Sequence, residues 1–223
     1  MPRQDLVTRL LARHGRTFCD EIGIDISANT PAPLFQWLVA STLYSARISA
    51  DKATEAARGL IAAGLTTPAR MARASWERRV AVLGAHGYKR FDESTATMLG
   101  DTATRLLETH GGDLRRLRKA CGRDPAAEHA GLQRFKGIGQ LGADIFCREA
   151  QAAWPELYPF ADEKALSAAR RLGLPGDSAG LAALVRQAEF PRLVAALVRT
   201  ALAGDDAALR DAQARDDPAP PSG

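Results

Sequence analysis

The chain has 223 residues, enough to bury an apolar core in one domain or in two lobes. No apolar run is long enough to span a bilayer, and the first residues lack the basic start and apolar core of a secretory signal, so we expect a cytoplasmic protein. The net charge of +4 is mildly basic, which is compatible with a nucleic-acid partner but does not require one.

Cysteine and histidine usage gives no sign of a metal site. The three cysteines, Cys19, Cys121 and Cys147, are odd in number and widely spaced, as expected for reduced thiols. None of the four histidines stands at metal-ligand spacing from another histidine or from a cysteine.

Alanine, leucine and arginine recur at helical spacing along the chain, and strand signals are nearly absent. The first helix is expected near residues 5–18. Thr67-Pro68 has the features of a helix start, a hydroxyl cap followed by proline at the first helical position. Glycine-rich turns at residues 111–112 and 173–176 separate later helices. The sequence therefore predicts an all-α fold.

Residues 132–146 read LQRFKGIGQLGADIF and form the most informative stretch of the chain. Leu132 and Phe135 are spaced as on one helical face, Gly137-Ile138-Gly139 breaks the helix, and a second apolar helix starts with Leu141. Two glycines allow a tight reversal, because glycine reaches backbone angles that side chains forbid. The second helix then offers unpaired N–H groups to a phosphate. The pattern predicts a helix-hairpin-helix that grips a DNA backbone regardless of base sequence.

An aspartate follows the hairpin. Asp162 lies 23 residues after Gly139, directly before an apolar-periodic helix that contains Leu166 and Leu172. An aspartate at a helix start is ordinarily an N-cap. A carboxylate can also stabilise positive charge on a sugar or orient an attacking water, as in glycoside hydrolysis. The two roles are compatible, and the residues alone favour the cap.

The hairpin and the later aspartate together resemble the helix-hairpin-helix/Gly-Pro-Asp superfamily of base-excision DNA glycosylases, and most closely its endonuclease III-like branch. The Phe35–Arg47 segment is similar to the family's early barrel helix. Gly84–Tyr88 and Leu106–Gly112 are similar to two later segments of the family. The resemblance spans residues 33–175.

The resemblance implies a two-lobed helical fold. It places an N-terminal helical segment at residues 1–32, packed with the C-terminal lobe. A helical barrel lobe occupies residues 33–148, and the C-terminal lobe with the aspartate occupies residues 149–204. Residues 205–223 have five aspartates, two arginines and too little apolar content to fold alone, so a disordered tail is expected there.

The resemblance also implies an activity and its residues. The expected reaction is hydrolysis of the N-glycosidic bond of a damaged or mismatched base flipped out of double-stranded DNA, by a monomer at the nucleoid. Asp162 matches the catalytic aspartate, and Arg47 matches a position that fills the gap left by the flipped base. The residues expected to contact DNA are Arg47, Lys136, Gly137, Ile138, Gly139, Gln140, Leu141, Ala143 and Lys164.

Departures from the family pattern narrow the expected chemistry. Bifunctional members have a Schiff-base lysine two residues after the second hairpin glycine, where this chain has Leu141. Neither Lys136 nor Lys164 matches that position, so we expect base removal without strand cleavage. Many relatives carry a four-cysteine iron–sulfur loop that nothing after Cys147 can supply, so no cofactor is expected. Glu163-Lys164 also stands where relatives have threonine and histidine.

Other interpretations stay open. The protein could be a catalytically silent DNA-binding relative in which Asp162 is only a cap, or a helical protein-interaction module. Arg47, Lys136 and Lys164 could be ordinary surface side chains. The basic run from Arg115 to Lys119 is either a solvated helix face or a phosphate-contacting face.

Overall fold

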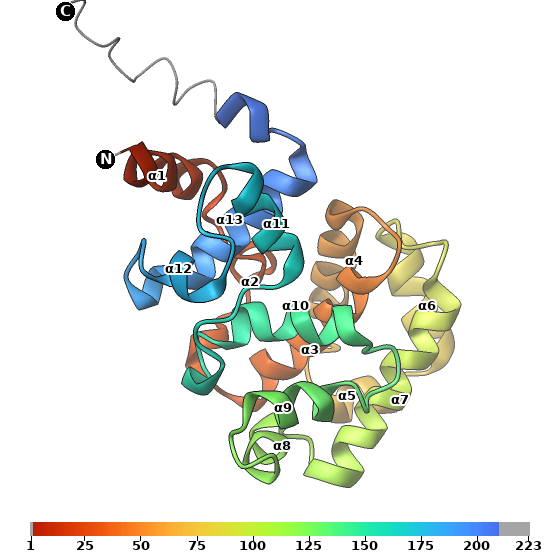
Figure 1. The fold of residues 1–223 in the computed structure, drawn as a ribbon. Helices are drawn as coiled ribbons and strands as arrows, with labels where there is room; N and C mark the ends of the chain where they lie inside the picture. Colours follow the sequence, from red (N-terminus) through yellow and green to blue (C-terminus); the bar gives the residue numbers. More distant parts are fainter. Residues whose placement is uncertain (1, 210–223) are drawn as a thin grey trace, which may run out of the picture. The chain divides into compact units, whose positions relative to one another are not determined.

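A computed structural model describes residues 2–209, and every regular element within this range is a helix (Figure 1). The prediction of an all-α fold is confirmed. The chain divides into two compact units, which we call the hairpin unit, Phe18–Tyr158, and the terminal unit, Met1–Thr17 with Pro159–Gly223. No helix among residues 2–209 is both long and apolar enough to cross a membrane.

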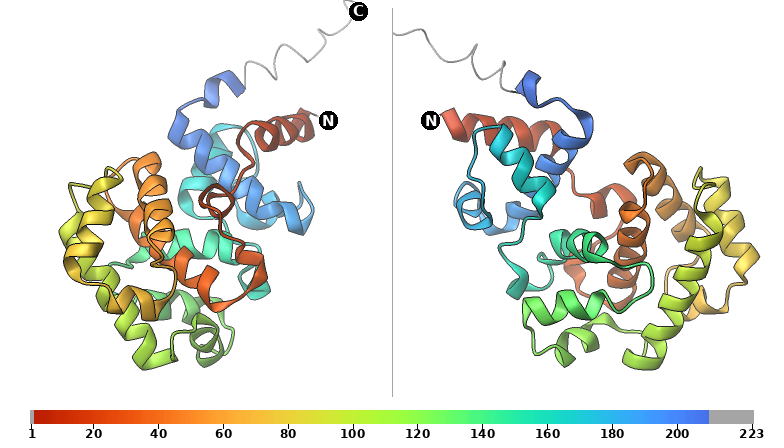
Figure 2. Two further views of the ribbon diagram at one scale, coloured as in Figure 1. Left: turned by 180° about the vertical axis from the view of Figure 1, so that it is seen from behind. Right: turned by 45° about the vertical axis from the view of Figure 1, so that its right-hand side comes forward.

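The hairpin unit is built around α3 (Pro31–Ser45), where Phe35, Trp37 and Leu38 are fully buried. A helix that is apolar on all sides belongs in a core rather than on a surface. The Trp37 indole donates to the Phe146 carbonyl over 3.0 Å, which ties α3 to its neighbour α10 (Gln140–Ala150) (Figures 1 and 2). The other elements of this unit are α2 (Phe18–Ile22), η1 (Ile26–Ala28), α4 (Ala50–Ala62), α5 (Pro68–Arg73), α6 (Trp76–Ala85), α7 (Asp92–His110), α8 (Leu114–Ala120), α9 (Pro125–Leu132) and η2 (Pro155–Leu157).

The terminal unit packs α1 (Pro2–His14) and α11 (Glu163–Arg171) against α13 (Phe190–Ala203). Leu193, Val194 and Leu197 of α13 are fully buried, and so is Leu10 of α1. This unit also contains α12 (Ser178–Ala182) and η3 (Gln187–Glu189). Burial of one apolar face per helix accounts for the packing.

Helix starts follow the local sequence. The Thr67 hydroxyl accepts from the Arg70 N–H over 3.3 Å, and Pro68 occupies the first helical position, so the predicted start of α5 is confirmed. Ser49, Ser75, Asp113 and Asp124 cap α4, α6, α8 and α9 in the same way. Each cap satisfies an N–H that the helix itself leaves without a partner.

The boundaries between units differ from those expected at residues 32 and 148. The Glu149 carboxylate accepts from the backbone N–H groups of Phe18 and Cys19 over 2.6 and 2.7 Å, which fixes the start of α2 to the end of α10. At the other boundary, the Trp154 ring lies edge-on to Phe146 at 5.4 Å between centroids. Residues 18–32 and 149–158 therefore belong to the hairpin unit, because long-range contacts that spacing does not reveal hold them there.

The predicted disordered tail, residues 205–223, begins too early in the sequence, because residues 205–209 make defined contacts. Asp205 forms an ion pair with Arg13 at 3.0 Å, its Oδ2 lies 2.9 Å from His14 Nε2, and Leu209 is buried. Asp206 pairs with Arg171 on α11. Residues 205–209 are thus held by charge pairs and apolar burial, while residues 210–223 lie outside the described part of the chain.

Candidate nucleic-acid interface and catalytic carboxylate

The predicted hairpin is present between α9 and α10. Gly137 has φ +86°, in the left-handed region that favours glycine. Ile138 is only 2% exposed and lies against Gly142 on α10, so it pins the turn as expected. Phe135 is buried like Leu132 but lies beyond the end of α9, so the two residues do not share one helix.

The two hairpin glycines have different surroundings. A Cβ on Gly137 would lie 2.8 Å from Met98 Sδ and 3.2 Å from Thr42 Cγ2, because α7 and α3 approach the turn closely. A Cβ on Gly139 would meet no heavy atom within 4 Å. Gly137 is therefore required by the fold, whereas Gly139 leaves open space in front of α10.

That space faces the start of a helix without a side-chain cap. Gly139 is the N-cap residue of α10 and has no side chain to accept a hydrogen bond. The N–H groups of Gln140, Leu141 and Gly142 consequently remain available in the described structure. Such N–H groups, with the positive end of the helix dipole, are suited to bind an anion. Gln140 is exposed and Leu141 is 48% exposed, whereas Ala143 is buried.

Polar contacts that the sequence did not reveal hold the hairpin together. His129 Nε2 on α9 lies 2.8 Å from Asp144 Oδ1 on α10, and the Gln133 amide lies 3.0 Å from His129 Nδ1. The Thr102 hydroxyl donates to the Lys136 carbonyl over 3.0 Å. No spacing rule indicated a role for His129, because its partner lies on the opposite helix of the hairpin.

The basic residues near the hairpin are differently engaged. Lys136 Nζ lies 2.8 Å from Asp101 Oδ2 in an exposed ion pair, so its charge is already partly compensated. Arg47 is exposed in the turn after α3, two residues beyond Ser45, whose hydroxyl borders Gly142 of the hairpin. In the basic run, Arg115 pairs with Asp113 and Arg118 with Glu156, so half of its charges have acidic partners.

In the terminal unit, Asp162 is the N-cap of α11. Its Oδ1 accepts from the Ala165 N–H over 3.2 Å, and the residue is 6% exposed. The Ala161 N–H donates to the Ser178 hydroxyl over 3.1 Å, which ties the segment to α12. Glu163 pairs with Arg170, and Lys164 is exposed on the first turn. The cap role predicted for Asp162 is confirmed.

The cysteines do not form a ligand set. Burial raises the pKa of the Cys19 and Cys147 thiols, which disfavours the thiolate that a metal needs. The Cys121 thiol donates to the Ala127 carbonyl over 3.3 Å. Among residues 2–209, no three His, Cys, Asp or Glu side chains gather as they would around a metal ion. These residues do not fit an iron–sulfur cluster, and its absence stays a prediction.

The helical architecture with the hairpin between α9 and α10 is also found in other proteins. Two solved structures share it. The structure of a non-covalent endonuclease III–DNA complex matches with a TM-score of 0.56 and 16% identity, over 88% of this chain and 81% of that one. A trapped endonuclease III–DNA covalent intermediate, an estranged-adenine complex, matches with a TM-score of 0.50 and 16% identity, over 75% and 73%. No protein-family model and no curated protein sequence matches the chain.

Proposed function

We propose that this protein is a DNA glycosylase that hydrolyses the N-glycosidic bond of a damaged or mismatched base flipped out of duplex DNA. The observation that carries the proposal is the uncapped start of α10 behind Gly139, in a fold shared with two endonuclease III structures that contain DNA. A backbone grip of this kind positions a duplex without reading its bases. It suits an enzyme that must bind at any sequence where a lesion occurs.

Asp162 is the residue we assign to the chemistry. Loss of a base builds positive charge on the sugar ring, and a carboxylate stabilises that charge or orients the attacking water. Asp162 combines a fixed backbone position with a carboxylate held at a helix start. Its Oδ1 accepts the capping hydrogen bond, and the cap role is compatible with a catalytic role for the same carboxylate.

We further propose that the enzyme removes the base without cutting the strand. Strand cleavage by this family's route requires an amine that forms a Schiff base with the sugar. Leu141 occupies that position on the first turn of α10 and offers only an apolar side chain. Lys136, five residues earlier, is paired with Asp101. The product would be an abasic site in an intact strand.

A second candidate is a catalytically silent DNA-binding protein. The hydrogen bond from the Ala165 N–H to Asp162 favours it, because that bond alone is a sufficient reason for an aspartate at this position. This candidate keeps the hairpin grip but predicts that no lesion is excised.

Single-turnover excision on duplexes that each carry one lesion separates the two candidates. Asp162→Asn keeps a capping oxygen but removes the negative charge, so we expect excision to slow by about a hundredfold or more while DNA affinity is kept. Asp177→Asn is the matched control, because Asp177 caps α12 in the same unit by accepting from the Gly180 N–H over 2.8 Å. Equal excision rates for the parent and Asp162→Asn would show that Asp162 acts only as a helix cap. If the parent excised no base from any lesion duplex, the catalytically silent DNA-binding protein would be favoured.

A further inference from the structure

The hairpin unit contains a hollow of about 380 Å³ lined by residues of α7, α8 and α9 and of the segment that leads from α9 into the hairpin. This volume lies in the range of roughly 300–1,000 Å³ that small-molecule sites occupy. About half of its wall is apolar, with Leu117, Ala127 and Phe135, and the other half is polar. Gly131 keeps it open, since a Cβ there would lie 3.2 Å from Cys121 Sγ and 3.5 Å from Leu117.

Two guanidinium groups reach this hollow from different segments. Arg105 comes from α7, and Arg134 comes from the segment that leads from α9 into the hairpin. The Arg105 charge, after burial, is a cause of the lowered pKa of His110, which also lines the hollow. Arg134 opposes the effect of burial on the pKa of Cys121. Both charges therefore act on groups of the same wall.

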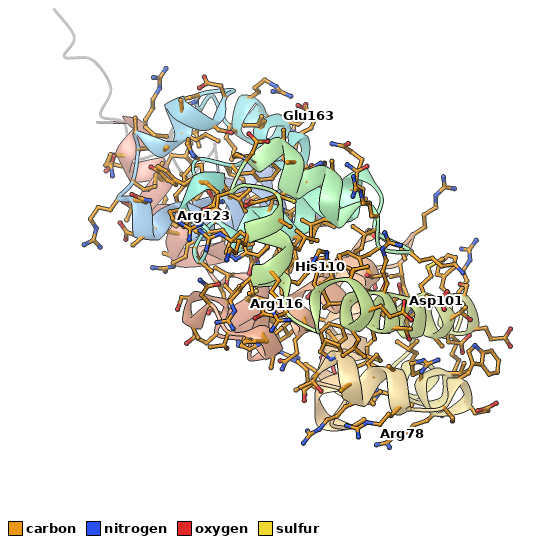
Figure 3. All side chains as sticks on the ribbon, turned by 90° about the horizontal axis from the view of Figure 1, so that it is seen from below. Arg78, Asp101, His110, Arg116, Arg123 and Glu163 are labelled. Atoms are coloured by element: carbon orange, nitrogen blue, oxygen red, sulfur yellow. The ribbon has the colours of Figure 1, made fainter. Side chains whose placement is uncertain are left out.

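Asp124 and Glu128 are near enough to act on the pKa of Cys121, but they do not line the hollow itself. No aspartate or glutamate is among the described residues that line it, and neither Arg105 nor Arg134 forms an ion pair within residues 2–209. Figure 3 labels His110 of this wall, seen from below, with Arg116 and Arg123 in the same view. Like charges around an enclosed space attract an anion.

We propose that this hollow binds a phosphate-bearing ligand of nucleotide size. Arg105 and Arg134 would hold the phosphate, because the planar guanidinium group matches phosphate oxygens with paired hydrogen bonds. The apolar side chains of the wall would pack against the base of the nucleotide. The phosphate comes either from a free nucleotide or from a nucleic-acid strand that passes the hairpin, since Arg134 stands three residues before Gly137. The inference does not depend on the glycosylase reaction.

The first test titrates the full chain with AMP, adenosine and inorganic phosphate by calorimetry. We expect AMP to bind most tightly, because it alone supplies both the anion and the ring. The double variant Arg105→Gln/Arg134→Gln should lose about tenfold or more in AMP affinity. Ala130→Leu, which adds an apolar side chain to the wall, should also lose affinity by filling the hollow. Arg78→Gln is the control, an exposed arginine on α6 that donates to the Ala63 carbonyl instead.

The second test measures the salt dependence of duplex binding and identifies the source of the phosphate. If the ligand is part of a strand, the double variant should lower the slope of log affinity against log salt by about 2, and AMP should compete with the duplex. If the ligand is a free nucleotide, AMP binds and the slope is unchanged. No AMP binding by the parent, together with equal slopes, would overturn the proposal. If the parent protein binds AMP through the two arginines but excises no base, the glycosylase proposal is contradicted and the proposed binding site is not.

Discussion

At the scale of single residues, the hairpin glycines make separable contributions. Gly137→Ala should destabilise the protein by about 2–4 kcal/mol, because the φ of +86° is costly for alanine and the new Cβ would press on Met98. Gly139→Ala should leave stability within about 0.5 kcal/mol, yet weaken duplex binding by about tenfold by obstructing the approach to the α10 N–H groups. Denaturant unfolding and duplex titration would measure the two effects.

Gly122→Ala provides the control for these variants. Gly122 also has positive φ, at +67°, but a Cβ there would meet no heavy atom within 4 Å. Gly122→Ala should lower the free energy of unfolding by about 1 kcal/mol, which measures the cost of positive φ for alanine without any steric contact. A Gly139→Ala protein that is folded and binds DNA as tightly as the parent would exclude the hairpin as the contact.

Leu141 gives a second prediction at this scale. The parent should not be trapped on abasic DNA by borohydride, because leucine cannot form the Schiff base that borohydride reduces. Leu141→Lys places an amine at a half-exposed position and should fold normally, so it should gain a trapped product on a denaturing gel. Efficient trapping of the parent would show that another amine attacks the sugar and would contradict base removal without strand cleavage.

At the scale of helices, a buried carboxyl group on α9 is paired with a second carboxyl group in η2. Glu128 on α9 is 0% exposed, and no donor among the described residues reaches its two oxygens. Glu156 of η2 accepts from Arg118 of α8 over 2.5 and 2.6 Å. Burial, then a hydrogen bond to Glu156 and its charge, raise the pKa of Glu128 to about 8. A proton on Glu128, donated to Glu156, satisfies the pair at neutral pH.

This pair should make stability depend on pH. Since the folded protein binds the Glu128 proton more tightly than the unfolded chain, the stabilisation is complete below the ordinary glutamate pKa and is lost as pH rises through about 8. Glu128→Gln keeps a hydrogen-bond donor but does not titrate, so its unfolding midpoint should fall less than that of the parent between about pH 5 and pH 9. Thermal melts across this range would measure the difference. Parallel pH profiles for the parent and the variant would show that Glu128 does not hold the proton.

Local patterns predicted the elements of the hairpin better than the contacts that hold it. Glycine conformation, helix spacing and caps act within a few residues, so the turn at Ile138 and the starts of α5 and α11 were predictable. The His129–Asp144 contact and the burial of Glu128 depend on which helices meet, and nothing in the spacing of those residues specifies it. The same is true of Glu149, whose partners Phe18 and Cys19 are more than a hundred residues earlier.

At the scale of the whole molecule, binding and chemistry are assigned to different units. Gly139 belongs to the hairpin unit and Asp162 to the terminal unit. Gly139→Ala should therefore weaken duplex affinity but leave the excision rate at saturating protein unchanged, whereas Asp162→Asn should do the reverse. In the double variant the two losses should add as free energies, within about 0.5 kcal/mol. If Gly139→Ala slowed excision at saturating protein as much as Asp162→Asn does, the hairpin would also contribute to the chemical step.

The order of the two units along the chain has a consequence for synthesis. The hairpin unit is continuous, whereas the terminal unit is assembled from both sides of it. A ribosome therefore delivers every residue of the hairpin before Asp162 emerges, and α1 must wait for α11 and α13 before it can be buried. The proposed function therefore implies that a nascent or prematurely ended chain would bind DNA before it could act on it.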